Sequence, residues 1–98
     1  MNSYTERFTY RTKPGLSVLD ISQDVQSAVR KSGINEGLCN VSVIGSTAGI
    51  STVEFEDGLV TDIEEYFEKV APSEKPYHHD AKWHDGNGHS HIRSTMSK

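Results

Sequence analysis

The chain has 98 residues, a formal net charge of −4 at pH 7 and a single cysteine, Cys39. This length predicts one domain with a modest core, and the acidic balance with dispersed Lys and Arg excludes the basic stripe that binds nucleic acid. No apolar run approaches the roughly 20 residues that span a bilayer, and one cysteine excludes an internal disulfide and a multi-cysteine zinc site. We therefore expect a cytoplasmic protein without nucleic-acid or membrane partners.

The first third of the chain predicts a strand, a turn and a helix. Side chains alternate over residues 4–12, with three aromatic rings on one face, which is typical of a half-buried strand. After a Lys-Pro-Gly turn, residues 17–33 carry apolar side chains at helical spacing. Either Asp20 or Ser22 is suited to cap the start of this helix, and Gly33 is suited to end it.

The middle of the chain predicts two further strands and a second helix. Residues 38–44 and 50–56 have the pattern of apolar strands around a small-residue loop, 45–49, and Cys39 falls on the inner face as a core thiol. Residues 59–72 carry the clearest helical periodicity and end in proline. Together the elements predict an α+β fold, a mainly antiparallel sheet with two amphipathic helices.

All five histidines fall within residues 78–91, together with Asp80, Asp85 and the only tryptophan. Imidazole is the commonest protein ligand for transition metals and the side chain best suited to acid–base chemistry near neutral pH. His79 and His91 are the strongest candidates as metal ligands, and the two aspartates are suited to complete the site or to orient an imidazole. The alternative is a solvated polar loop whose histidines share no ligand.

Polar residues elsewhere in the chain are further candidates. Ser46 and Thr47 lie among small residues, where hydroxyl and backbone N–H groups bind anions such as phosphate, but the same pattern is typical of a plain turn. Glu54 lies in an apolar strand pattern, either on its wet face or facing the histidines. Asn87, in a Gly-Asn-Gly turn, is suited to cap a helix that begins near His89.

Two stretches carry a family pattern: GLCNVSVIGSTAGISTVEFE (37–56) and YHHDAKWHDGNGHSHIRSTM (77–96). They resemble the YjbQ family, also labelled secondary thiamine-phosphate synthases. The matching positions are Thr47-Ala48-Gly49, Glu54, His79-Asp80, Asn87, His91 and Arg93-Ser94. The resemblance implies an α+β fold with an antiparallel sheet, a trimer and a histidine-lined cleft suited to a metal. It also favours a final helix, in which the side chains of His89 and His91 diverge, whereas a strand would point both to one side.

The chain departs from the family pattern at two places. Many members carry a histidine where Gly45 stands, so one ligand or base is absent, and we expect Gly45 to serve a sharp backbone bend at positive φ. Family chains also continue with further strands beyond the position matched by Lys98. From the resemblance we expect residues 1–98 to form one domain that lacks C-terminal strands, is poorly stable alone and self-associates.

The resemblance implies an enzyme that couples a pyrimidine diphosphate to a thiazole phosphate, a thiamine-phosphate synthase, or that acts on a related phosphorylated metabolite. In this hypothesis the residues divide into a catalytic set, His91, Glu54, Asp80 and Asn87, a substrate-binding set, Ser46, Thr47 and Arg93, and a metal-ligand set, His79 and His91. The expected cofactor is a divalent metal such as zinc, and the expected assembly is a homotrimer. The alternative is a non-catalytic metal-binding or assembly subunit.

Overall fold

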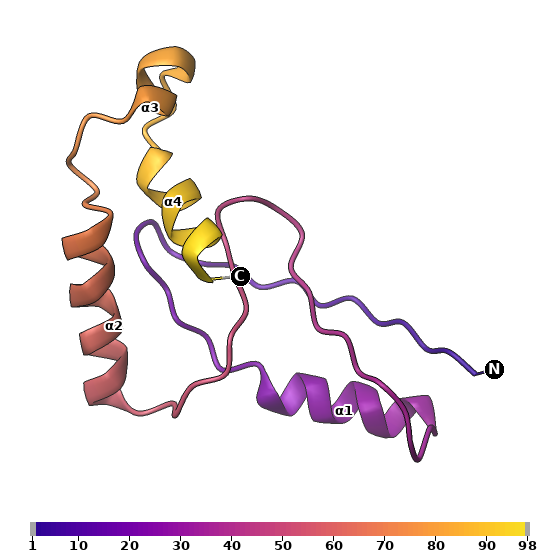
Figure 1. Cartoon of the computed structure of the whole chain (residues 1–98). Helices are drawn as coiled ribbons and strands as arrows, with labels where there is room; N and C mark the ends of the chain where they lie inside the picture. The colour runs from indigo at the N-terminus through magenta and orange to yellow at the C-terminus, as the bar shows by residue number, and fades with distance from the viewer. Residues whose placement is uncertain (1, 98) are drawn as a thin grey trace. The chain divides into compact units, whose positions relative to one another are not determined.

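The computed structural model describes residues 2–97, within which the chain forms four helices joined by irregular segments (Figure 1). The helices are α1 (Ser22–Ser32), α2 (Asp57–Val70), α3 (His78–Trp83) and α4 (Gly88–Ser97). The chain divides into two compact units, the first ending at Val41 and the second beginning at Ser42. None of the helices in the described part of the chain is long and apolar enough to cross a membrane.

The predicted antiparallel sheet is wrong, because residues 2–97 contain no strand. Residues 4–12, 38–44 and 50–56 are irregular, and the backbone bond found among them, from Glu56 N–H to the Glu54 carbonyl, stays within one segment. Alternating side chains report which residues would share a face, but a strand also needs a second segment whose N–H and C=O groups align with its own. The alternation is present here without that pairing.

The absence of a sheet leaves the apolar side chains of these segments uncovered. Side chains expected on a buried sheet face are exposed: Tyr4, Phe8, Tyr10, Cys39, Val41 and Val43. The prediction that Cys39 is a core thiol is therefore wrong. Among the described residues, Ala71 is the buried hydrophobic residue, at 1% exposure, so polar contacts carry much of the local organisation described below.

In the first unit, α1 begins and ends close to the predicted positions. The Asp20 carboxylate accepts a hydrogen bond from Ser22 N–H at 2.9 Å, so Asp20 supports the first turn. Hydrogen bonds from Ser22, the side chain first, lower the pKa of Asp20. At the other end, Gly33 adopts φ 68° and its N–H donates to the Arg30 carbonyl, as expected for a helix stop.

The N-terminal segment is attached to α1 by two side-chain contacts. The Tyr10 hydroxyl donates to the Asp24 carboxylate, and Lys31 Nζ lies 3.4 Å from Glu6 Oε1. The hydrogen bond to Asp24 raises the pKa of Tyr10 to about 12 from its ordinary 10.0. Since the neutral phenol is the donor, this bond favours the protonated tyrosine.

In the second unit, α2 starts two residues before the predicted position because Glu56 caps it. The Glu56 carboxylate accepts from Gly58 N–H at 2.7 Å and from Leu59 N–H at 2.9 Å, which satisfies two otherwise unpaired amides of the first turn. The helix ends at Ala71, whose N–H donates to the Phe67 carbonyl. The prediction of a second amphipathic helix in this region is confirmed.

Helix α4 contacts both the end of α2 and the 45–49 loop in the second unit. Arg93, 8% exposed, donates to the Ala71 carbonyl through Nε at 3.1 Å and Nη2 at 2.9 Å, and its Nη2 lies 2.8 Å from Glu68 Oε2. On another side of the helix, the Ser94 hydroxyl donates to the Ala48 carbonyl. These contacts tie the end of α2 and the 45–49 loop to α4. Gly45 in that loop has φ 123°, the positive value expected from the sequence.

We predict that removing Asp24 lowers the pKa of Tyr10. In an Asp24→Ala chain the hydroxyl loses its acceptor, so the Tyr10 pKa should fall from about 12 towards 10.0, measured as phenolate absorbance against pH. In the parent chain, the stability from this bond is fully present below the unfolded pKa and is lost as the pH rises through about 12. An Asp62→Ala chain serves as control, and equal titration curves for both variants would contradict the prediction.

Candidate metal site at the α3–α4 turn

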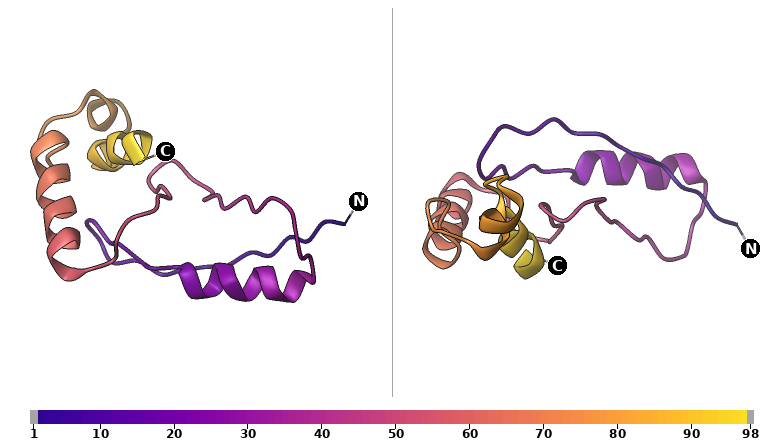
Figure 2. Two further views of the ribbon diagram at one scale, coloured as in Figure 1. Left: turned by 60° about the horizontal axis from the view of Figure 1, so that its bottom comes forward. Right: turned by 90° about the horizontal axis from the view of Figure 1, so that it is seen from above.

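A short turn places the five histidines of the chain on or between α3 and α4. Helix α3 ends at His84, which adopts the left-handed conformation with φ 57° and donates its N–H to the Asp80 carbonyl at 2.7 Å. Gly86, at φ 68°, continues the turn, and α4 begins at Gly88. The two helices pack against each other and lie next to each other in every view (Figures 1 and 2).

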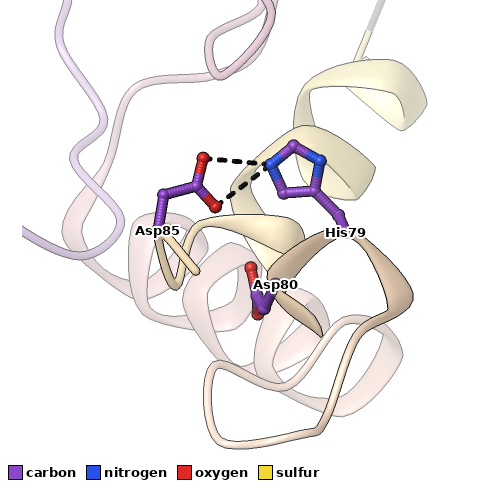
Figure 3. A group of neighbouring side chains, drawn as sticks. All are labelled: His79, Asp80 and Asp85. Carbon is purple, nitrogen blue, oxygen red and sulfur yellow. Dashed lines mark hydrogen bonds and ion pairs between the residues drawn. The ribbon is translucent and has the colours of Figure 1, made fainter. Parts of the chain in front are cut away.

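The turn brings His79 and Asp85 into contact (Figure 3). His79 Nε2 lies 3.2 Å from each carboxylate oxygen of Asp85 and 2.9 Å from the Asn87 side-chain amide. The side chains of His79 and Asp85 are 32% and 43% exposed, so solvent and ions reach the group. One ligand atom each from His79, Asp80 and Asp85 lies within 4.8 Å of the others, a spacing compatible with a shared cation.

The Asn87 amide completes the hydrogen bonds of this group. With Nδ2 directed at the group, the amide donates to Asp85 at 3.0 and 3.2 Å and to His79 Nε2 at 2.9 Å. The three side chains therefore satisfy one another through hydrogen bonds.

Asp80 has a different task from Asp85. Its Oδ1 accepts the Gly88 N–H at 2.9 Å, so Asp80 on α3 supplies the acceptor for the first amide of α4. Gly88 is buried against Tyr77, so closely that a Cβ at this position would lie 2.6 Å from Tyr77 Cβ. Asp80 and Gly88 therefore define how α4 starts beside α3.

His91 and His89 point to different surroundings, as the predicted final helix required. The His91 ring centroid lies 4.4 Å from that of His79, with the rings tilted by 54°. The His89 ring lies 6.4 Å from Tyr77, and its Nδ1 is buried without a hydrogen-bond partner. His91 adjoins the site beside His79, although it lies outside the group of three side chains whose ligand atoms are within 4.8 Å of one another.

The 45–49 loop reaches α4 one turn away from His91. Ser94, which binds the Ala48 carbonyl, follows His91 by three residues and so shares its face of the helix. Ser46 and Thr47 are exposed in this loop.

Two predicted site residues have other surroundings. Glu54 is exposed, and no hydrogen bond to its side chain is found among residues 2–97. Arg93 is engaged with Ala71 and Glu68 at the end of α2. The hydrogen bond from the Ser73 backbone N–H and, to a smaller extent, the one from Arg93 lower the pKa of Glu68. Glu68 is therefore charged beside the guanidinium. The sequence carries no short-range signal for this pair, whose members are 25 residues apart.

The similarity of the chain to known proteins extends over nearly its whole length. The family described as UPF0047 protein YjbQ-like matches residues 6–98. This chain belongs to the YjbQ-like UPF0047 family. UPF0047 relatives include proteins of Methanothermobacter thermautotrophicus, 34% identical over 98% of this chain, and of Archaeoglobus fulgidus, 32% identical over 90%. A UPF0047 protein of Synechocystis is 30% identical over 86% of the chain.

This UPF0047 chain spans 66% of the length of the first two relatives and 58% of the third. No solved structure matches it significantly. The family membership expected from the histidine-rich segment and the 45–49 loop is confirmed.

We predict that Gly88→Ala destabilises the second unit. The added methyl group would lie 2.6 Å from Tyr77 Cβ, an atom fixed to the backbone that cannot swing aside. Overpacking of this kind costs about 1–3 kcal/mol, which outweighs the helix propensity of up to about 1 kcal/mol that alanine gains. Thermal unfolding followed by circular dichroism measures the difference. Gly37→Ala is the matched control, since its new methyl group meets Ile34 Cγ2 at an ordinary 3.5 Å. Equal effects of the two substitutions would contradict the close packing at Gly88.

Proposed function

We propose that this UPF0047 chain contributes a divalent-cation site to an enzyme that acts on a small phosphorylated substrate. The observation that carries the proposal is the convergence of His79, Asp80 and Asp85, which each offer one ligand atom within 4.8 Å of the others. One imidazole nitrogen with carboxylate oxygens is a donor set suited to Zn²⁺, Fe²⁺ or Mn²⁺. The donors present therefore fit a divalent cation.

The ligand set that we propose differs in emphasis from the pair expected from sequence. His79 remains a ligand. Asp85 joins it, because its carboxylate oxygens lie 3.2 Å from His79 Nε2, and Asp80 also orients the turn by accepting the Gly88 N–H. His91, with its ring 4.4 Å from His79, is proposed as the acid–base group beside the cation. This arrangement separates the ligands from the group that moves a proton.

The same surroundings support a phosphorylated substrate. A bound divalent cation neutralises charge on phosphoryl oxygens and polarises them. Ser46 and Thr47 are exposed hydroxyl residues on the loop that Ser94 ties to α4, and we propose that they hold phosphate oxygens. Arg93 is proposed to act indirectly, by holding α4 in place through Ala71 and Glu68.

The candidate reaction is the coupling of a pyrimidine diphosphate to a thiazole phosphate, as the family resemblance implies. In this reaction the pyrimidine carbon loses pyrophosphate and forms a bond to the thiazole nitrogen. A cation beside the diphosphate is suited to assist the leaving group. Family membership supports this candidate only at the level of UPF0047.

A non-catalytic metal-binding assembly subunit is the second candidate, and the exposure of apolar side chains favours it. Leu38, Ile44 and Phe55 are 105%, 84% and 51% exposed. Side chains of this kind become buried when copies of a chain associate. We therefore propose a homo-oligomer, a trimer by family resemblance, for either function.

We predict that the parent chain binds Zn²⁺ or Mn²⁺ and that the His79→Ala and Asp85→Ala chains bind it about 10–100-fold more weakly. Titration calorimetry measures the affinities. Binding should weaken as the solution is acidified, because a protonated imidazole has no lone pair to offer a metal. His78→Ala, which removes an exposed histidine from the same helix, is the control.

Equal affinity of the His78→Ala and His79→Ala chains would contradict the proposed cation site. A His91→Ala chain that binds the metal as the parent does, but turns over substrate more slowly, would agree with the proposed acid–base role. Substrate turnover unaffected by His91→Ala would contradict that role.

A further inference from the structure

Three hydroxyl side chains near the end of α4 have two kinds of partner. The hydroxyl groups of Thr95 and Ser97 each donate to the carbonyl four residues before them, at 2.9 and 2.7 Å. This carbonyl is the usual partner of a serine or threonine inside a helix. The Ser94 hydroxyl instead donates to the carbonyl of Ala48, 46 residues away in the chain.

The contact made by Ser94 is buried and has a second contact beside it. Ser94 is 3% exposed. Gly49, the next residue of the loop, approaches α4 so closely that a Cβ at this position would lie 2.6 Å from Ser97 Cβ. Because a hydrogen bond is directional, the bond to Ala48 fixes where the loop lies along the helix, and the close approach of Gly49 fixes how near it lies.

Stability alone does not require the bond between Ser94 and Ala48. A Ser94 hydroxyl turned to its own helix would be satisfied as those of Thr95 and Ser97 are. Ala48 is exposed and has access to water as an alternative partner. What the bond adds is a fixed position of the 45–49 loop on α4.

This position relates the loop to His91. Ser94 follows His91 by three residues, so the two side chains are neighbours on one face of α4, with a rise of about 4.5 Å between them. Thr47, which is exposed, directly precedes Ala48 in the loop. The bond made by Ser94 therefore holds the backbone next to Thr47 about one helical turn from the position of His91.

We propose that Ser94 is a positioning residue for phosphate binding. Its hydroxyl holds the 45–49 loop on α4, so that Ser46 and Thr47 keep a fixed distance from His91. Ser94 acts through Ala48 and does not contact the substrate. The inference rests on the proposed function and adds to it the residue that couples the phosphate-binding loop to the helix of the acid–base group.

The test is a Ser94→Ala substitution in the full 98-residue chain, with Thr95→Ala as control because the Thr95 hydroxyl bonds only within α4. Titration calorimetry measures pyrophosphate binding to the Mn²⁺-loaded chains. Pyrophosphate should bind Ser94→Ala about tenfold more weakly than the parent, since the loop must now be ordered on binding, and Thr95→Ala as the parent does. The Mn²⁺ affinity of Ser94→Ala should equal that of the parent, because the proposed ligands lie on α3 and the turn after it.

A second variant separates the loop from α4 without removing a hydroxyl group. In Gly49→Ala the new methyl group would lie 2.6 Å from Ser97 Cβ, an atom fixed to the helix backbone. Pyrophosphate should therefore bind the Mn²⁺-loaded Gly49→Ala chain about tenfold more weakly than the parent, again with unchanged Mn²⁺ affinity. Gly37→Ala, whose methyl group meets Ile34 at 3.5 Å, is the control.

The outcomes separate this inference from the function beneath it. If the loaded parent binds pyrophosphate and Ser94→Ala binds it equally well, the proposed function stands and the role of Ser94 is refuted. If Ser94→Ala loses Mn²⁺ and pyrophosphate affinity together, Ser94 supports only the fold, which also refutes the inference. If the loaded parent binds no pyrophosphate, the phosphate site itself is refuted, and the role of Ser94 with it.

Discussion

The hydrogen bond from Gly88 N–H to Asp80 Oδ1, 2.9 Å long, is the constraint on which the site depends. It lets α4 begin directly beside α3, and this is possible because position 88 has no Cβ to meet Tyr77. A helix that starts with its first amide capped from a neighbouring helix releases the residue before it from capping. That residue, Asn87, is consequently available to His79 and Asp85.

Helix α4, once its start is fixed, contacts several other parts of the second unit. Its first turns present His91 to His79, and the next turn presents Ser94 to the 45–49 loop. Arg93 faces the end of α2, where its buried guanidinium accounts for three hydrogen bonds to Ala71 and Glu68. The guanidinium is buried, so these bonds anchor α4 in a unit with little buried apolar surface.

Local features of the fold were predictable from sequence where a short-range signal determines them. Gly33 ends α1 at φ 68°, and the apolar periodicity after residue 59 corresponds to α2. The absence of a sheet was not predictable in this way, because residues 38–44 and 50–56 have strand-like alternation but no backbone partner within residues 2–97. Pairing is a long-range property, and alternation says nothing about it.

The same distinction applies to the candidate site. The clustering of histidines within fourteen positions marked the region, and the helical reading of the final segment separated His89 from His91. Asp80, and not Asn87 as expected, accepts the first amide of α4. This depends on how closely Gly88 approaches Tyr77, which composition and spacing do not indicate. The buried Arg93 was likewise assigned to substrate from its family position, whereas its contacts lie on α2.

Backbone amide exchange with and without Zn²⁺ tests the central claim, that a cation joins α3 to the turn before α4 through His79, Asp80 and Asp85. The amides of Gly88 and His91, which bond to Asp80 Oδ1 and the Asn87 carbonyl, report directly on the start of α4. We predict that Zn²⁺ slows exchange at these two amides, while the amides of α1 exchange at the same rate as before. Unchanged exchange at Gly88 and His91 under saturating Zn²⁺ would contradict the account.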